Sequence, residues 1–210
     1  MIYYSIHTEE EEWKSETGTV NMKTISSEGK VYNIAMTAMM ICIIMVSIAL
    51  FRIPIPFTQG FVNLSDAMVF MGVIILGWKY GAIAAGLGSL LGDLLSGFPV
   101  WAPWSLVIKA GMALIFGMAL QTLVENKHWS VSPRRFLTVE VLGMIIAGVF
   151  MTAAYYFAEG IMYGNWVVAA LGIPWNIGQA LVGACLAVIL NTALTKTSLR
   201  SRMVYSMPER

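Results

Sequence analysis

The chain has 210 residues, of which 58% are hydrophobic and only 12% are charged, and its formal net charge is +1. Soluble domains carry about 25% charged residues, so this composition excludes an ordinary soluble domain. The near-neutral charge also argues against a nucleic-acid partner, because no dense basic face exists to neutralise phosphates. A helix that spans a bilayer needs about 20 residues, so the length predicts one membrane domain of about six helices.

The apolar segments and their breaks predict an all-α membrane bundle over residues 31–196. Residues 1–30 are polar and lack the basic-then-apolar order of a signal peptide, so we expect a cytoplasmic tail, with Met22 as an alternative start. Residues 197–210 are expected to form a basic cytoplasmic tail. The predicted transmembrane helices span residues 31–51, 64–78, 81–97, 105–124, 136–158 and 174–195.

The positions of the cations predict the orientation of this bundle. Eleven of the thirteen Lys and Arg residues fall in the termini or in the second and fourth loops, and only Arg52 and Lys109 lie elsewhere. Cytoplasmic loops carry an excess of Lys and Arg, so both termini are predicted to be cytoplasmic. The Pro- and Trp-rich first, third and fifth loops then face outward.

Charged residues inside the predicted helices gather near the outward side. Such groups are costly in a bilayer, so each needs a partner, water or a function. Asp93 and Lys109 are predicted at similar depth on successive helices, which favours an ion pair. Such a pair could either fix the packing of the two helices or contact a ligand, and the sequence favours neither role over the other.

Three further carboxylates need separate interpretations. Asp66 lies in VNLSDAMVF, where capping of its own helix is favoured over contact with a ligand. Glu159 has no basic neighbour in the sequence, so a functional role is favoured. Glu140 lies about one turn inside the cytoplasmic end of its helix, from which it is expected to extend toward water.

Polar side chains at helical spacing predict one wall of a binding site. Tyr155, Glu159 and Tyr163 recur at i, i+4 and i+8, which places them on one face of a helix. Asn176 and Gln179 follow at i and i+3 on the last helix. Amides both donate and accept hydrogen bonds, so this wall suits an uncharged heteroaromatic ring that bears hydroxyl groups.

Trp101 and Trp104 lie in the predicted third loop, bracketed by prolines. One interpretation is that they belong to the aromatic belt that many membrane proteins place at the interface. The other, which we favour slightly, is that they stack over a bound ring as a lid.

Rows of small residues predict close helix contacts. Gly81, Ala85 and Ser89 recur every four residues, and Gly88 and Gly92 lie one register over. Ala35, Ala38 and Cys42 form a looser row on the first helix. Such rows pack helices inside a bundle or dock a partner, and composition does not choose between these uses.

The segment GFVNLSDAMVFMGVIILGWKYGAIAAGLGSLLGDLLSGFPVWAPWSLVIKAGMALIFG resembles the central block of the S components of energy-coupling-factor (ECF) transporters. YYFAEGIMYGNW and IPWNIGQALVG resemble the last two helices of the riboflavin-type branch, particularly its members for pyridoxine, hydroxymethylpyrimidine or pantothenate. The similarity covers residues 31–195.

This resemblance implies a six-helix, non-catalytic subunit in a bacterial plasma membrane that captures one vitamin from outside. It implies docking on a transmembrane coupling protein with two ATPases, which use ATP, and toppling to release the cargo. The family's docking motif is Ala-x-x-x-Ala, and Ala38 to Cys42, with Ala35 one turn earlier, is the nearest match. Lys109 and Asp93 would form the floor of the site.

Other classes of function fit the sequence less well. A membrane enzyme would use Asp66, Asp93 and Glu159, but the sequence contains no GxSxG, HExxH or clustered Asp motif. A phosphate loop is also missing, so ATP hydrolysis would come from partners. An autonomous secondary carrier is disfavoured because the sequence shows no inverted repeat. No bound cofactor or metal is expected for this chain.

Overall fold

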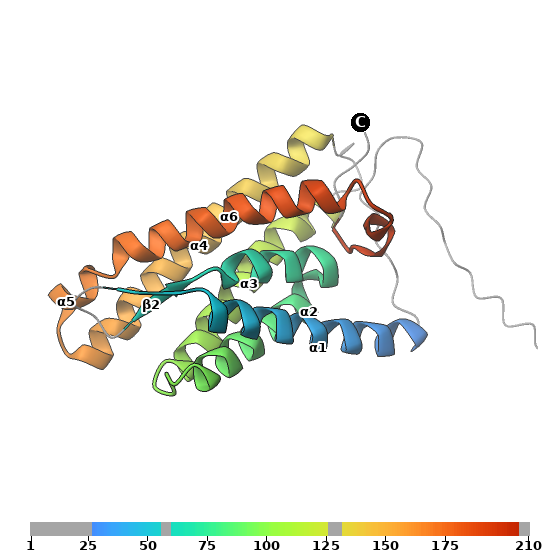
Figure 1. The fold of residues 1–210 in the computed structure, drawn as a ribbon. Helices are drawn as coiled ribbons and strands as arrows, with labels where there is room; N and C mark the ends of the chain where they lie inside the picture. Colours follow the sequence, from blue (N-terminus) through green and yellow to red (C-terminus); the bar gives the residue numbers. More distant parts are fainter. Residues whose placement is uncertain (1–26, 56–59, 126–131, 206–210) are drawn as a thin grey trace, which may run out of the picture.

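The computed structural model describes residues 27–55, 60–125 and 132–205, and it is mostly helical (Figure 1). Residues 1–26 of the predicted tail (residues 1–30), with Met22, lie outside these residues, and residues 27–30 belong to the first helix instead of the tail. The all-α prediction is corrected by a short antiparallel hairpin that replaces part of the first loop. The elements are α1 Ser27–Leu50, β1 Arg52–Pro54, β2 Phe61–Asn63, α2 Ser65–Leu95, α3 Ala102–Glu125, α4 Pro133–Tyr163, α5 Trp166–Ala170, α6 Ile173–Leu194 and the 3-10 helix η1 Ser198–Arg202.

Helix α2 contains a sharp bend at Gly77, which joins two helices that the sequence predicts separately. Gly77 has φ of 81° and ψ of 170°, a conformation that residues with a side chain rarely adopt. A Cβ on Gly81 would lie 2.7 Å from the Cα of Val73, although these residues are eight apart in sequence. The bend therefore brings the two arms of α2 against each other.

Five helical segments of the described residues are long and apolar enough to cross a membrane. The predicted count of six spans is not confirmed, because the second and third predicted helices form the single bent element α2. The start of α1 and η1 lie at the same end of the bundle, whereas the hairpin and α5 lie at the opposite end (Figure 1). The guanidinium of Arg202 in η1 lies 5.8 Å from the ring of Tyr32 in α1, so η1 lies beside the start of α1.

The hairpin is held against the loop that follows α2. Arg52 donates to the backbone carbonyl of Ser96 at 2.9 Å, and its guanidinium lies 6.0 Å from the Phe98 ring. Phe61 of β2 packs on the same ring at 4.7 Å. Arg52 therefore attaches the hairpin to the loop after α2. It is one of the two cations that lie outside the predicted cytoplasmic set.

The small residues predicted to mediate close contacts do so inside the bundle on α2. A Cβ on Gly88 would lie 2.8 Å from Ile44, and one on Gly92 would lie 2.8 Å from Ile48. Both isoleucines are fully or almost fully buried on α1. The glycine row of α2 thus accommodates α1, which resolves the open question for that row in favour of internal packing.

The segment after η1 returns to the bend in α2. The amides of Val204 and Tyr205 donate to the carbonyls of Ile75 and Ile74 at 3.2 and 2.9 Å. At a bend these carbonyls lose their helical partners, so the C-terminal segment supplies the donors that they need. Tyr205 is 1% exposed, and its hydroxyl donates to Gln121 at 2.7 Å.

Replacing Tyr205 with Phe tests this attachment. The substitution keeps the buried ring and removes one hydrogen bond, which is worth about 1 kcal/mol in folded proteins. We expect a small decrease in the thermal unfolding midpoint of the detergent-solubilised protein. An unchanged midpoint would show that the bond to Gln121 contributes nothing to stability.

Candidate binding site

A polar cavity lies at the hairpin end of the bundle, where β2, the end of α2, the start of α3, α4 and α6 meet. Its volume is about 20 Å³, room for about one water molecule, so a ring-sized ligand requires side chains to move. Polar and aromatic side chains make up most of the lining. The lining residues are Ile55, Gly60, Phe61, Asn63, Asp93, Trp101, Ser105, Tyr155, Glu159, Asn176 and Gln179.

Most of the residues predicted for the site meet at this cavity. Asp93, Trp101, Tyr155, Glu159, Asn176 and Gln179 all line it. Trp101 is 6% exposed, and its ring lies 6.1 Å from Tyr155 and 6.3 Å from Tyr163. Trp104 does not line the cavity and instead packs against the hydrophobic core. The two tryptophans therefore differ in position, and only Trp101 is placed as the lid interpretation requires.

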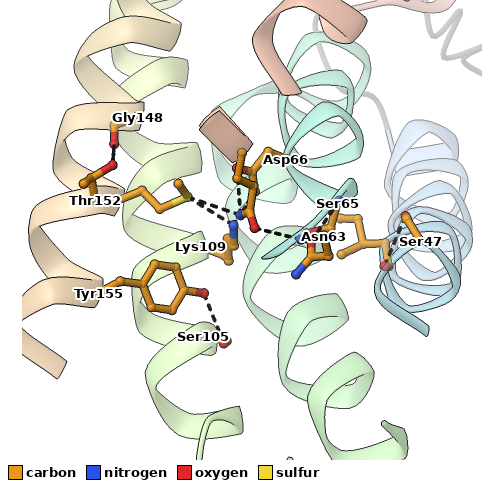
Figure 2. A network of polar contacts seen from close by, with 12 residues as sticks. Ser47, Asn63, Ser65, Asp66, Ser105, Lys109, Gly148, Thr152 and Tyr155 are labelled. Carbon is orange, nitrogen blue, oxygen red and sulfur yellow. Dashed lines mark hydrogen bonds and ion pairs between the residues drawn. The ribbon is translucent and has the colours of Figure 1, made fainter. Parts of the chain in front are cut away.

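The predicted ion pair between Asp93 and Lys109 is wrong, because Lys109 pairs with Asp66. Figure 2 shows the two side chains facing each other, and both are at most 2% exposed. The ammonium also lies 3.2 Å from the sulfur of Met151 and 5.6 Å from the Tyr155 ring centre. Asp93 lies near Lys109 and the Ser105 hydroxyl without forming a salt bridge among the described residues.

The capping role predicted for Asp66 is also wrong. Helix α2 has no side-chain cap at Leu64, and Asn63 instead accepts a hydrogen bond from the Ser65 amide at 2.9 Å. Helix α6 approaches Asp66 closely at Gly183, where a Cβ would lie 2.5 Å from that of Asp66. A buried carboxylate needs a cation, and Lys109 is the one within reach.

Gln179 connects the hairpin to the buried ion pair. Its amide oxygen accepts from the Asn63 backbone N–H at 2.8 Å, and its nitrogen donates to Asp66 at 3.0 Å. Both ends of the side chain are therefore engaged within the protein. Gln179 therefore holds β2 over the cavity, whereas the Asn176 side chain forms no hydrogen bond with another described residue.

Two carboxylates at the cavity have an oxygen with no hydrogen-bond partner. These atoms are Oδ2 of Asp93 and Oε2 of Glu159, and each side chain is 2% exposed. Glu159 packs on the backbone of Gly172, where a Cβ would lie 2.4 Å from Oε2. Unpartnered buried acceptors are rare and costly, so both oxygens are available for a donor from a ligand.

Five lining residues were absent from the predicted site: Ile55, Gly60, Phe61, Asn63 and Ser105. Ser105 lies 3.2 Å from the Tyr155 hydroxyl, which links α3 to the predicted wall (Figure 2). The strand that carries Phe61 and Asn63 is only three residues long, so its alternation is too short to detect. The signal that could have identified Asn63 is its place two residues before α2, which carries the buried Asp66 in its first turn.

The residues predicted for partner docking lie on the surface of α1. Ala35, Ala38 and Cys42 are all exposed, and the buried side of the helix is formed by other residues. Small exposed residues on an apolar helix leave room for close approach of another helix.

Several long apolar helices around a polar cavity near one end define a multi-pass membrane protein. A family model for the S component of ECF-type riboflavin transporters matches residues 28–196, so the chain belongs to that family, as the resemblance predicted. Members of this family are transporter subunits and not enzymes.

Individual relatives agree with this membership. The chain is 28% identical over 151 residues to the thiamine precursor transporter HmpT of Lactococcus lactis, covering 71% of this chain and 80% of that protein. It is 32% identical over 119 residues to an uncharacterised protein of Pyrococcus woesei, covering 57% and 72% of the two chains.

Solved structures share the fold. A structure described as the S component of a bacterial ECF transporter has a TM-score of 0.59 at 22% identity, covering 80% of this chain and 97% of that one. The S component for biotin from an ECF-type ABC transporter has a TM-score of 0.62 at 16% identity, covering 83% and 96%. The fold of this chain is therefore that of an S component.

Proposed function

We propose that this chain captures a pyridoxine-like or hydroxymethylpyrimidine-like vitamin and delivers it to the cytoplasm as part of an ECF importer. The observation that carries the choice of ligand is the pair of unpartnered carboxylate oxygens on Asp93 and Glu159. Lys109 is already engaged by Asp66, so the buried described residues at and beside the cavity comprise three carboxylates and one cation. Such a site favours ligands that present hydroxyl or amino donors.

Pantothenate is the alternative cargo, and the charge of the cavity argues against it. Its carboxylate would face Asp93 and Glu159 without a free cation to pair with among the described cavity residues. Like charges in a buried site disfavour one another. The similarity to a thiamine precursor transporter points in the same direction as the donor-seeking site.

The same proposal includes six crossings with both termini in the cytoplasm. The bend at Gly77 turns α2 back on itself, and the two ends of the described chain lie at the same end of the bundle, as an even number of crossings requires. The cavity then opens toward the outer side. Exposed Ala35, Ala38 and Cys42 of α1 would dock on the coupling protein, whose two ATPases supply the energy for toppling.

The ligand is tested by titrating the purified protein with hydroxymethylpyrimidine, pyridoxine and pantothenate and following tryptophan fluorescence. Trp101 lines the cavity, so occupancy is expected to change its emission. We expect saturable binding of at least one of the first two ligands and none of pantothenate. Tightest binding of pantothenate would contradict the charge argument, and substrate turnover by the isolated chain would contradict the transport proposal.

Glu159→Gln and Asn176→Ala test the wall itself. Each removes a polar group at the cavity, and hydrogen bonds to charged groups are worth about 1.5 to 3 kcal/mol, so we expect about tenfold or greater loss of affinity for Glu159→Gln. Asn176→Ala should have a smaller effect in the same direction. Isothermal titration with the tightest of the three ligands measures both.

The matched control is Glu140→Gln, the same substitution on the same helix at the far end from the cavity. It should leave affinity unchanged, because Glu140 does not line the cavity and the Gln amide oxygen can still accept from Asn191. Unchanged affinity in both Glu159→Gln and Asn176→Ala would remove this wall from the binding site.

A further inference from the structure

Glu140 and Asn191 form a buried polar pair at the end of the bundle opposite the hairpin. Glu140 was expected to extend toward water, but its side chain is 0% exposed, and so is that of Asn191. The Asn191 side-chain nitrogen donates to Oε1 of Glu140 at 2.7 Å. The pair joins α4 to α6 inside the apolar part of the molecule.

Each side chain of this pair has one oxygen without a hydrogen-bond partner. These atoms are Oε2 of Glu140 and Oδ1 of Asn191. An ionised carboxylate offers only acceptors, so an ionised Glu140 would leave both oxygens unsatisfied. It would also be a buried negative charge without a salt bridge among the described residues. Both conditions are unfavourable inside a membrane protein.

Among the residues that the structure describes, no charged group forms an ion pair with Glu140 that would stabilise an anion. Phe136 and Met144 are buried one turn before and one turn after it on α4. Gly143 packs on Phe116 and Ala119 of α3, so the neighbouring helix is also apolar here. Asn191 is the one described residue that forms a hydrogen bond with Glu140.

We propose that Glu140 holds a proton on Oε2 and donates it to Oδ1 of Asn191, so that the two side chains form a cyclic acid–amide pair. A carboxylic acid and a primary amide each present one donor and one acceptor, and their edges are complementary. One added proton therefore satisfies both orphaned oxygens. The proton is taken up from water by the carboxylate, and no other bond is made or broken.

The pair connects the two helices that carry the predicted wall. Tyr155 and Glu159 lie on α4, and Asn176 lies on α6, about 22 to 28 Å from the pair at 1.5 Å per residue. With two hydrogen bonds instead of one, the pair fixes the distance and the rotation of α4 relative to α6 at one end. The proposal concerns the protein without its ligand and does not depend on which vitamin binds.

Infrared difference spectroscopy of the full chain in detergent at neutral pH tests the protonation. The spectrum of the wild type minus that of Glu140→Gln isolates the Glu140 carboxyl, and Gln preserves the shape and neutrality of the acid. We expect loss of a protonated carboxyl C=O stretch in the variant. Loss of a carboxylate stretch instead would overturn the proposal.

A second variant tests the hydrogen bond to Asn191. Asn191→Leu keeps similar volume but removes both the donor to Oε1 and the acceptor for Oε2, so the C=O band of Glu140 should shift to higher frequency while the acid remains protonated. A band at the wild-type frequency would overturn the acid–amide pair. Asn191→Leu leaves Glu140 in place, so it provides a readout even where Glu140→Gln folds poorly.

Discussion

Lys109→Met is expected to cause the largest loss of stability of any single substitution considered for this protein. The change leaves Asp66, which is 0% exposed, without its ion-pair partner. Breaking a buried pair by removing one member costs about 3 to 5 kcal/mol, because an uncompensated charge remains buried. Thermal unfolding in detergent, with the yield of monodisperse protein as a second measure, reports the effect.

Two further variants show whether the loss comes from the pair. Lys79→Met removes an exposed lysine on the second arm of α2 and should change the midpoint little. Asp66→Asn combined with Lys109→Met removes both charges and should recover much of the lost stability, since contacting residues are not additive. Additive losses in the double variant would contradict a direct pair and favour independent roles.

The second large effect is expected from Gly81→Ala. The new Cβ would lie 2.7 Å from Cα and 3.0 Å from the backbone nitrogen of Val73, atoms that cannot rotate away. Overpacking of this kind costs about 1 to 3 kcal/mol and sometimes more. We expect a clear decrease in the thermal midpoint, because the two arms of α2 must separate.

Gly178→Ala is the matched control for this substitution. Gly178 lies within α6, and an added Cβ there would have no heavy atom within 4 Å. Alanine is favoured over glycine inside helices, so this variant should be as stable as the wild type or slightly more stable. Equal destabilisation by both substitutions would show that loss of glycine itself, and not the contact with Val73, is responsible.

The parts of the site that follow local periodicity were predictable from the sequence. Tyr155 and Glu159 face the cavity with Asn176 and Gln179 because helical spacing fixes which residues share a face. Depth was predictable too, since Asp66 and Asp93 both lie near Lys109. The rotation of one helix about its axis relative to the next helix was not predictable. The sequence therefore assigned Asp93 to Lys109 in place of Asp66.

One long-range contact and two short elements explain the other errors. Gly183 lets α6 approach Asp66, and nothing near Asp66 in sequence indicates this contact. The hairpin was read as a loop because its strands are three residues long and β1 ends in Pro54. Helix α5 was missed because it has five residues, although Asn165 provides a cap signal by accepting from the amides of Val167 and Val168.

The attachment of the C-terminal segment to the bend has a consequence for biosynthesis. Ile74 and Ile75 leave the ribosome long before Val204 and Tyr205, whose amides are the partners of their carbonyls. The carbonyls of Ile74 and Ile75 therefore lack these two donors while α3, α4 and α6 are being synthesised, and they gain them only when the final residues of the described chain arrive.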